Sequence, residues 1–238
     1  MRYLFLLFLI WIYACKQKIV KQAATETDKK DSIIIIDEEK TDSIALKSFE
    51  GLADTTFVRL ADFSTDFSYE MRYATTNNFL KTKVYDCAEC YTRVKTAKAL
   101  LAANAEFMAK GFRIKFFDCY RPHSVQYKMW DVVPNPQYVA DPRKGSIHNK
   151  GGAVDITLED LAGNELDMGT DFDFFGKRAH HDYLNLSDQI LENRELLKET
   201  MEKHGFWSIR TEWWHYNLRI GSNDKVSNFK WPCQSTTP

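Results

Sequence analysis

Two stretches of the chain place apolar residues at the three- and four-residue spacing of one helix face. Residues 92–110 form the first, and Gly111 suits its end because glycine readily adopts the left-handed conformation that follows many helices. Residues 187–204 form the second, with Ser187 as a good N-cap and Gly205 at the end. The pattern therefore predicts two amphipathic helices, each packed through one face.

Sequence that favours β-strands lies between and after these helices. Residues 113–120 alternate roughly in polarity and are rich in Phe and Ile, which predicts a strand. Pro122 suits the first turn of a further helix running to about Asp131, so Arg121 is expected at a strand-to-helix junction. Residues 206–218 are again β-prone. Because no regular βαβ rhythm or internal repeat is present, we predict an α+β fold with an antiparallel or mixed sheet flanked by helices.

The first residues have the layout of a secretory signal peptide. An apolar run from Tyr3 to Ala14 follows a short basic start and is shorter than the roughly 20 residues that span a membrane. Cys15 then resembles the lipidated cysteine of bacterial lipoproteins, although Tyr13 is bulkier than that signal prefers, so plain cleavage or an uncleaved anchor stays open. We expect a signal peptide over residues 1–14 and an exported protein of the periplasm or cell envelope, anchored through Cys15.

A charged segment separates this start from the rest of the chain. Residues 16–48 interleave seven basic with seven acidic side chains and hold no aromatic one. Such a segment cannot bury enough apolar area to offset its loss of conformational entropy on folding. We therefore expect a lipidated cysteine and flexible tether over residues 15–54, and a folded domain over residues 55–238.

The charge balance argues against polyelectrolyte partners. The 238 residues carry 32 Lys and Arg against 33 Asp and Glu, a formal net charge of −1. No overall field would draw in nucleic acid or an anionic membrane. We expect no nucleic-acid partner, and membrane contact only through the N-terminal lipid or signal segment.

Four cysteines remain in the expected domain. An exported protein allows one or two disulfides, and the three pairings of Cys87, Cys90, Cys119 and Cys233 cannot be separated from sequence. Cys87 and Cys90 could also form half of a structural zinc site, although a second closely spaced Cys or His pair is missing.

Two segments carry residues suited to metal chemistry. A hydrolytic zinc site takes three protein ligands and leaves one position open for water, and His148, Asp155 and His215 supply such a set. On a straight strand, the seven-residue separation of His148 and Asp155 would hold them more than about 20 Å apart. Gly151 and Gly152 would let the chain turn back, so we expect a loop return here.

Glu212 lies three residues before His215 and could face the same metal without binding it. A carboxylate there can take a proton from the attacking water and return it to the leaving amine. Residues three apart share a face in a helix but not in a strand. Because Trp213, Trp214 and Tyr216 favour a strand, the spacing predicts a bend or strand end near Glu212. The two tryptophans themselves are more typical of core than of substrate stacking.

Taken together, these motifs resemble the D-alanyl-D-alanine dipeptidases, the VanX-type zinc peptidases. The resemblance rests on Ser146-x-His148-x-x-Gly151-x-Ala153-x-Asp155, Glu212-x-Trp214-His215, Asp118-x-Tyr120-Arg121-Pro122, Tyr73 to Phe79, and Met168 to Phe175. It covers about residues 55 to 220, in order. It implies hydrolysis of a small dipeptide from cell-wall metabolism, with one Zn²⁺ per chain in a central cleft, held by His148, Asp155 and His215.

The same resemblance implies roles for four further residues. Glu212 would be the catalytic base, and Arg121 would stabilise the oxyanion of the tetrahedral intermediate. Asp173 would pair with the free amino terminus of the dipeptide, and Ser146 would lie near the substrate. A structural alternative for Asp173 is the cap of a turn within residues 169–176.

Two other functions remain in competition. A zinc carboxypeptidase or endopeptidase trimming peptidoglycan stem peptides would use the same site in a wider cleft, and a long insertion that caps the site would argue against it. A non-catalytic, zinc-stabilised binding module has no need of both Glu212 and Arg121, which are both present. Stereochemical preference, oligomeric state and pathway do not follow from the sequence.

Overall fold

The described part of the chain builds a five-stranded mixed sheet, which confirms the predicted α+β class. The computed structural model describes residues 45–219 and 224–233. The predicted signal peptide, Cys15 and the larger part of the predicted tether lie outside the described residues. In spatial order the strands are β2 (Ser68–Tyr69), β4 (Phe112–Asp118), β5 (Ala153–Asp160), β7 (Glu212–Leu218) and β6 (Phe206–Ile209). β2 runs parallel to β4, and the other neighbours are antiparallel.

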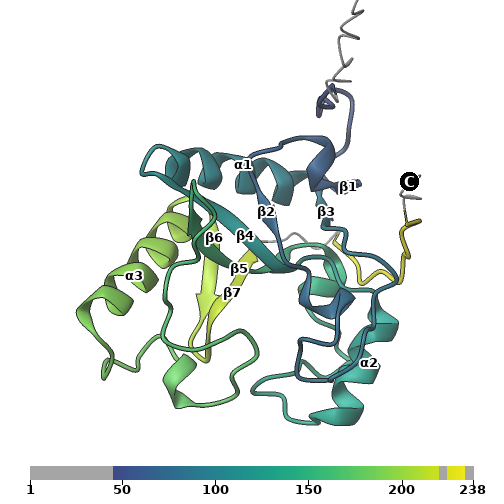
Figure 1. Cartoon of the computed structure of the whole chain (residues 1–238). Coiled ribbons are helices and arrows are strands. Elements are labelled where there is room, and N and C mark those ends of the chain that lie inside the picture. Colours follow the sequence, from purple (N-terminus) through teal and green to yellow (C-terminus); the bar gives the residue numbers. More distant parts are fainter. Residues whose placement is uncertain (1–44, 220–223, 234–238) are drawn as a thin grey trace, which may run out of the picture. The chain divides into compact units, whose positions relative to one another are not determined.

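Helices cover this sheet, as Figure 1 shows. They are α1 (Val94–Met108), α2 (His123–Val132) and α3 (Asp188–Lys203), so both predicted amphipathic helices are confirmed. α1 packs on β4 and on α3, while α3 packs on β6. In Figure 1, α2 lies on the other side of the fold, at the lower right. Within the described residues, no helix has both the length and the apolar character to cross a membrane.

Shorter elements join the sheet to the helices. β1 (Phe57–Arg59) and β3 (Tyr91–Arg93) pair as a small second sheet, which is why α1 begins two residues later than the spacing predicts. The single-turn 3₁₀ helices are η1 (Leu60–Asp62), η2 (Arg72–Ala74), η3 (His148–Lys150) and η4 (Lys177–Ala179). Arg121 lies between β4 and α2, as predicted. Pro122 occupies the N-cap with ψ of 138°, one position before the first turn in which we expected it.

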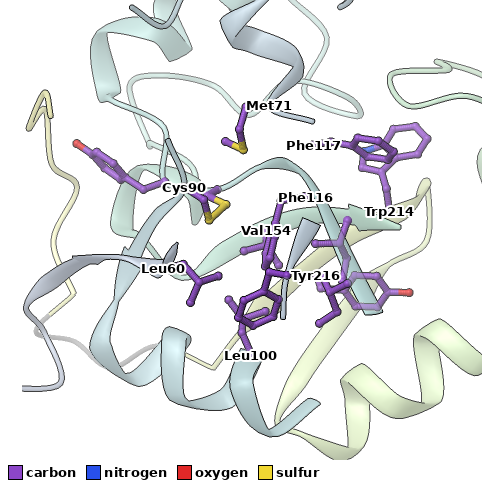
Figure 2. Packing of buried hydrophobic residues seen from close by; sticks show 14 of the residues in the cluster. Leu60, Met71, Cys90, Leu100, Phe116, Phe117, Val154, Trp214 and Tyr216 are labelled. Carbon is purple, nitrogen blue, oxygen red and sulfur yellow. A yellow bond between two sulfur atoms is a disulfide. The ribbon is translucent and has the colours of Figure 1, made fainter. Parts of the chain in front are cut away.

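Both faces of the sheet are buried. Neighbouring residues of a strand point to opposite faces, and Phe116 and Phe117 of β4 are each fully buried. Figure 2 shows Phe116 near Leu100 of α1 and Phe117 beside Trp214. The Phe117 ring also packs on that of Phe172, with centroids 5.0 Å apart. Polar side chains of the sheet, such as those of Asp118, Asp155 and Thr157, are buried as well.

Two disulfides tie the C-terminal segment and the small sheet to the rest of the fold. Cys87 pairs with Cys233, and Cys90 pairs with Cys119 directly after β4. The Cys90 disulfide lies within the core drawn in Figure 2. The alternative of a structural zinc site at Cys87 and Cys90 is wrong, because both sulfurs are used in these bonds.

Candidate metal centre and active site

Three buried side chains converge where β5 and β7 pair. His148 Nε2 lies 3.1 Å from His215 Nδ1 and 3.3 Å from Asp155 Oδ1, and His215 Nδ1 lies 2.9 Å from that same oxygen. Ligands bound tetrahedrally to zinc at about 2.0–2.1 Å lie about 3.4 Å from one another. The three atoms thus approximate one triangular face of a metal coordination sphere, and they can hold a divalent metal.

The local backbone explains this convergence. Asp155 and His215 are direct partners in the antiparallel β5–β7 ladder, so their side chains project from the same face. His148 reaches them from η3, after which Gly151 turns the chain with φ of +72°. A Cβ at Gly151 would also collide with the ring of Phe57. The loop return expected between His148 and Asp155 is therefore present, and it requires glycine.

Partners outside the triad fix the orientation of both histidines. His148 Nδ1 lies 2.7 Å from the Cys119 carbonyl oxygen, and His215 Nε2 lies 3.0 Å from Asn217 Oδ1. Because these oxygens only accept hydrogen bonds, each of the two nitrogens donates, and the opposite ring nitrogen turns a lone pair toward the centre. Burial opposes ionisation of Asp155, but the positive charges and hydrogen bonds that the two histidines supply when they are protonated hold its pKa well below the ordinary value. Two imidazole lone pairs and an ionised Asp155 are the ligand forms that bind a metal cation.

Glu212 lines the same cavity as His215, at the first residue of β7. The register between β6 and β7 shifts between Ser208 and Ile209, which is the predicted irregularity near Glu212. Burial, reinforced by the negative charges of Asp155 and Asp173, raises the pKa of Glu212 to about 8. A carboxyl group with a pKa near neutrality can both accept and return a proton.

Arg121 is held rigidly beside the metal ligands. Its Nε and Nη2 donate to Asp118 Oδ2 over 3.0 and 2.7 Å, and Nη2 lies 3.7 Å from Asp155 Oδ2. Asp118 is itself fully buried and accepts a hydrogen bond of 2.8 Å from the Tyr85 hydroxyl. The guanidinium lines the cavity with its charge fixed, an arrangement suited to stabilising developing negative charge.

Asp173 lines another part of this cavity and adopts a left-handed backbone conformation, with φ of +61°. Its carboxylate accepts hydrogen bonds from the Tyr73 hydroxyl over 3.0 Å and the Phe79 N–H over 3.3 Å. Burial, followed by the charge of Asp155, raises the pKa of Asp173 to about 7. These hydrogen-bond donors come from residues 73–79 and not from the turn of residues 169–176. The carboxylate is available to a cationic group in the cavity.

The cavity itself is small and is lined by all the residues predicted to bind metal or substrate or to act in catalysis. It has a volume of about 230 Å³. Ser146 lies on its wall and accepts a 3.2 Å hydrogen bond from the His148 N–H. Trp214 is both core and cavity wall. The predicted site residues that line the cavity are Arg121, Ser146, His148, Asp155, Asp173, Glu212 and His215.

Other residues of the site were not assigned roles from sequence. Tyr73 and Asp118 belong to segments that carry the family resemblance, but Asn217 has no such signal. Among the described residues, His148, Asp155 and His215 form a group of metal-ligating side chains whose ligand atoms all lie within 4.8 Å of one another. His123, by contrast, contacts the Pro142 carbonyl oxygen and lies outside this group.

Comparisons with known proteins agree on one family. A family model described as D-ala-D-ala dipeptidase matches residues 53–232. A protein named D-alanyl-D-alanine dipeptidase from Escherichia coli is 36% identical over 168 residues, covering 70% of this chain and 87% of its own. Proteins of the same name from Enterococcus faecalis and Enterococcus faecium are each 31% identical, covering 68% and 63% of this chain and 91% and 85% of their own.

A solved structure is more distantly similar. The vancomycin-resistance D,D-pentapeptidase VanY in complex with Zn(II) aligns with a TM-score of 0.38 at 17% identity. The alignment covers 54% of this chain and 73% of that one. This likeness is too weak to establish a shared fold.

Proposed function

The chain belongs to the Peptidase_M15 family of D-Ala-D-Ala dipeptidases, and we propose that it hydrolyses D-alanyl-D-alanine to free D-alanine in cell-wall peptide metabolism. One zinc ion per chain would be held by His148, Asp155 and His215. The observation that carries the proposal is the meeting of this triad with Arg121 and Glu212 in one buried cavity. When bound, zinc supplies Lewis-acid polarisation of the scissile carbonyl and lowers the pKa of water.

The protein's own groups would carry the remaining steps. Asp173 pairs with the ammonium group of the dipeptide and so orients the scissile bond. Glu212 accepts a proton from the attacking water and passes it to the nitrogen of the leaving amino acid. Arg121 donates hydrogen bonds to the carbonyl oxygen as negative charge develops on it. Arg121 and Glu212 are buried, and a lower local dielectric strengthens their electrostatic contacts.

The family favours a dipeptide over a peptidoglycan stem, because the matching relatives are named D-alanyl-D-alanine dipeptidases. The cavity, about 230 Å³ in volume, suits a small ligand. Part of its wall comes from residues 136–140 and 145–147, between α2 and η3. A non-catalytic binding module is disfavoured because such a module needs neither the proton-accepting Glu212 nor the fixed charge of Arg121 in the metal cavity.

Three substrates test this function with one zinc-loaded preparation: D-Ala-D-Ala, L-Ala-L-Ala, and D-Ala-D-Ala with a blocked amino group. We expect rapid hydrolysis of the first and far slower hydrolysis of the other two. Release from the blocked substrate at a comparable rate would favour a carboxypeptidase or endopeptidase. No hydrolysis of any substrate by a protein that holds zinc stoichiometrically would favour the binding module.

The place of action is a separate proposal. The apolar run that ends at Ala14, with Cys15 directly after it, supports a lipoprotein held at the cell envelope by a lipid on Cys15. Mass spectrometry of the mature protein from a bacterial host should give an N-terminal diacylated cysteine. A mature chain that begins at another residue, or lacks the lipid, would rule this anchor out.

A further inference from the structure

Gln126 connects Arg121 to the wall of the cavity. The side chain extends from α2 and is fully buried. Its Oε1 accepts a 3.1 Å hydrogen bond from Arg121 Nη1, and its Nε2 donates a 2.8 Å hydrogen bond to the Ala140 carbonyl oxygen. A fully buried amide that uses both ends in this way links two groups in a fixed geometry.

The first link completes the support of the guanidinium. A guanidinium is planar and has five N–H donors. Asp118 takes the Nε donor and one Nη2 donor, and Gln126 takes one Nη1 donor. One donor remains on each terminal nitrogen. Because Asp118 and Gln126 bind different nitrogens of the plane, the orientation of these two donors is fixed, and the guanidinium lines the cavity.

The second link holds the wall segment, residues 136–140. Pro136 to Ala140 line the cavity, and α2 contacts this stretch and its continuation at two carbonyl groups. Gln126 donates to the Ala140 carbonyl oxygen, and His123 Nε2 lies 2.7 Å from the Pro142 carbonyl oxygen. Of these two contacts, the one made by Gln126 also involves Arg121.

We propose that Gln126 is a positioning residue, which orients the Arg121 guanidinium toward the reacting carbonyl and couples that orientation to the placement of the wall segment, residues 136–140. The proposal rests on the function proposed above and deepens it. Gln126 acts through Arg121 and need not touch the substrate. Without the Nη1 contact the guanidinium can tilt about its bond to Asp118, and small errors in the placement of catalytic groups cost rate steeply.

Gln126→Met removes both hydrogen bonds at similar volume. With zinc loaded, we expect kcat on D-Ala-D-Ala to fall by about 10- to 100-fold and zinc affinity, measured by chelator competition, to stay unchanged. Gln126→Glu keeps an acceptor for Arg121 but loses the donor to Ala140. This variant should retain most of the wild-type kcat and have a higher KM. The matched control is Gln189→Met on the exposed face of α3, which should behave as wild type.

A double-mutant cycle with Arg121→Ala decides the role. If Gln126 acts through Arg121, Gln126→Met should cost little further kcat once the arginine is gone. Equal fractional losses in both backgrounds, or equal kcat losses for the Met and Glu variants, would overturn the proposal. These outcomes compare variants with an active wild type, so they are distinct from failure of the proposed function, which appears as absence of D-alanine release by the wild-type enzyme itself.

Discussion

Replacing Asp173 by Asn should separate substrate recognition from folding. Asn tolerates the φ of +61° at this position as Asp does, and has nearly the same shape. The substitution removes the charge that would pair with the ammonium of the substrate. A charged hydrogen bond in such a site contributes about 1.5–3 kcal/mol, so kcat/KM on D-Ala-D-Ala should fall roughly 10- to 150-fold. An acetylated dipeptide has no ammonium, so its hydrolysis should not change.

The same variant should change how stability depends on pH. Burial, with the charge of Asp155, raises the pKa of Asp173 from 3.8 to about 7. The folded protein therefore binds this proton more tightly than the unfolded chain, and stability falls as pH rises between the two pKa values. From about pH 5 to about pH 8 the cost to the wild type is about 2.5 kcal/mol, at 1.36 kcal/mol per pKa unit. The Asn variant should not show this loss of stability.

Two assays check these results. Urea unfolding of both proteins, with metal removed by a chelator, gives the free energy of unfolding at each pH. The rate on free and acetylated dipeptide gives the substrate preference of the zinc-loaded proteins. The same pH dependence of stability in both proteins would refute the burial argument. An unchanged ratio of the two substrates would refute the ammonium-binding role of Asp173.

Three further predictions concern the metal, the oxyanion and a disulfide. His215→Ala should remove zinc and activity together, and stoichiometric zinc by elemental analysis of that variant would contradict the ligand assignment. Arg121→Ala should keep zinc but lower the rate by roughly 10² to 10³, so an unchanged kcat would exclude its oxyanion role. Replacing both Cys90 and Cys119 by Ala opens a loop with a sequence separation of 29, which should lower the free energy of unfolding by about 3.5 kcal/mol. Urea unfolding measures that loss. The double substitution should also weaken zinc binding, because the Cys119 carbonyl orients His148.

Sequence patterns predicted the long elements of the fold better than the short ones. The helices α1 and α3 and the strand β4 have periodic or alternating residues over several turns or pairs, so they could be predicted. β1, β2 and β3 each have three residues or fewer. They are too short to show a periodic pattern of apolar and polar residues. β5 is buried on both faces from Ala153 to Glu159, so it lacks the alternation that marks a half-exposed strand.

The site divides in a similar way. The metal triad and Glu212 were predicted because zinc chemistry limits the residue types, and the predicted turn at Gly151 brings His148 and Asp155 together. The groups that orient them could not be predicted. The partner of His148 is a backbone carbonyl, which every residue has, and Asn217 and Gln126 are ordinary polar residues whose roles depend on tertiary placement. Spacing along the chain identifies the reactive groups, whereas their supports appear only in the folded structure.

Release of D-alanine from D-Ala-D-Ala by the wild type and by Glu212→Gln, at equal zinc content, tests the central claim most directly. The wild type should release D-alanine, and the variant should hold the same zinc yet work more slowly by roughly 10² to 10⁴, because it lacks only the proton-accepting carboxylate. Near-normal release by the Gln variant, or none by the zinc-loaded wild type, would contradict the account.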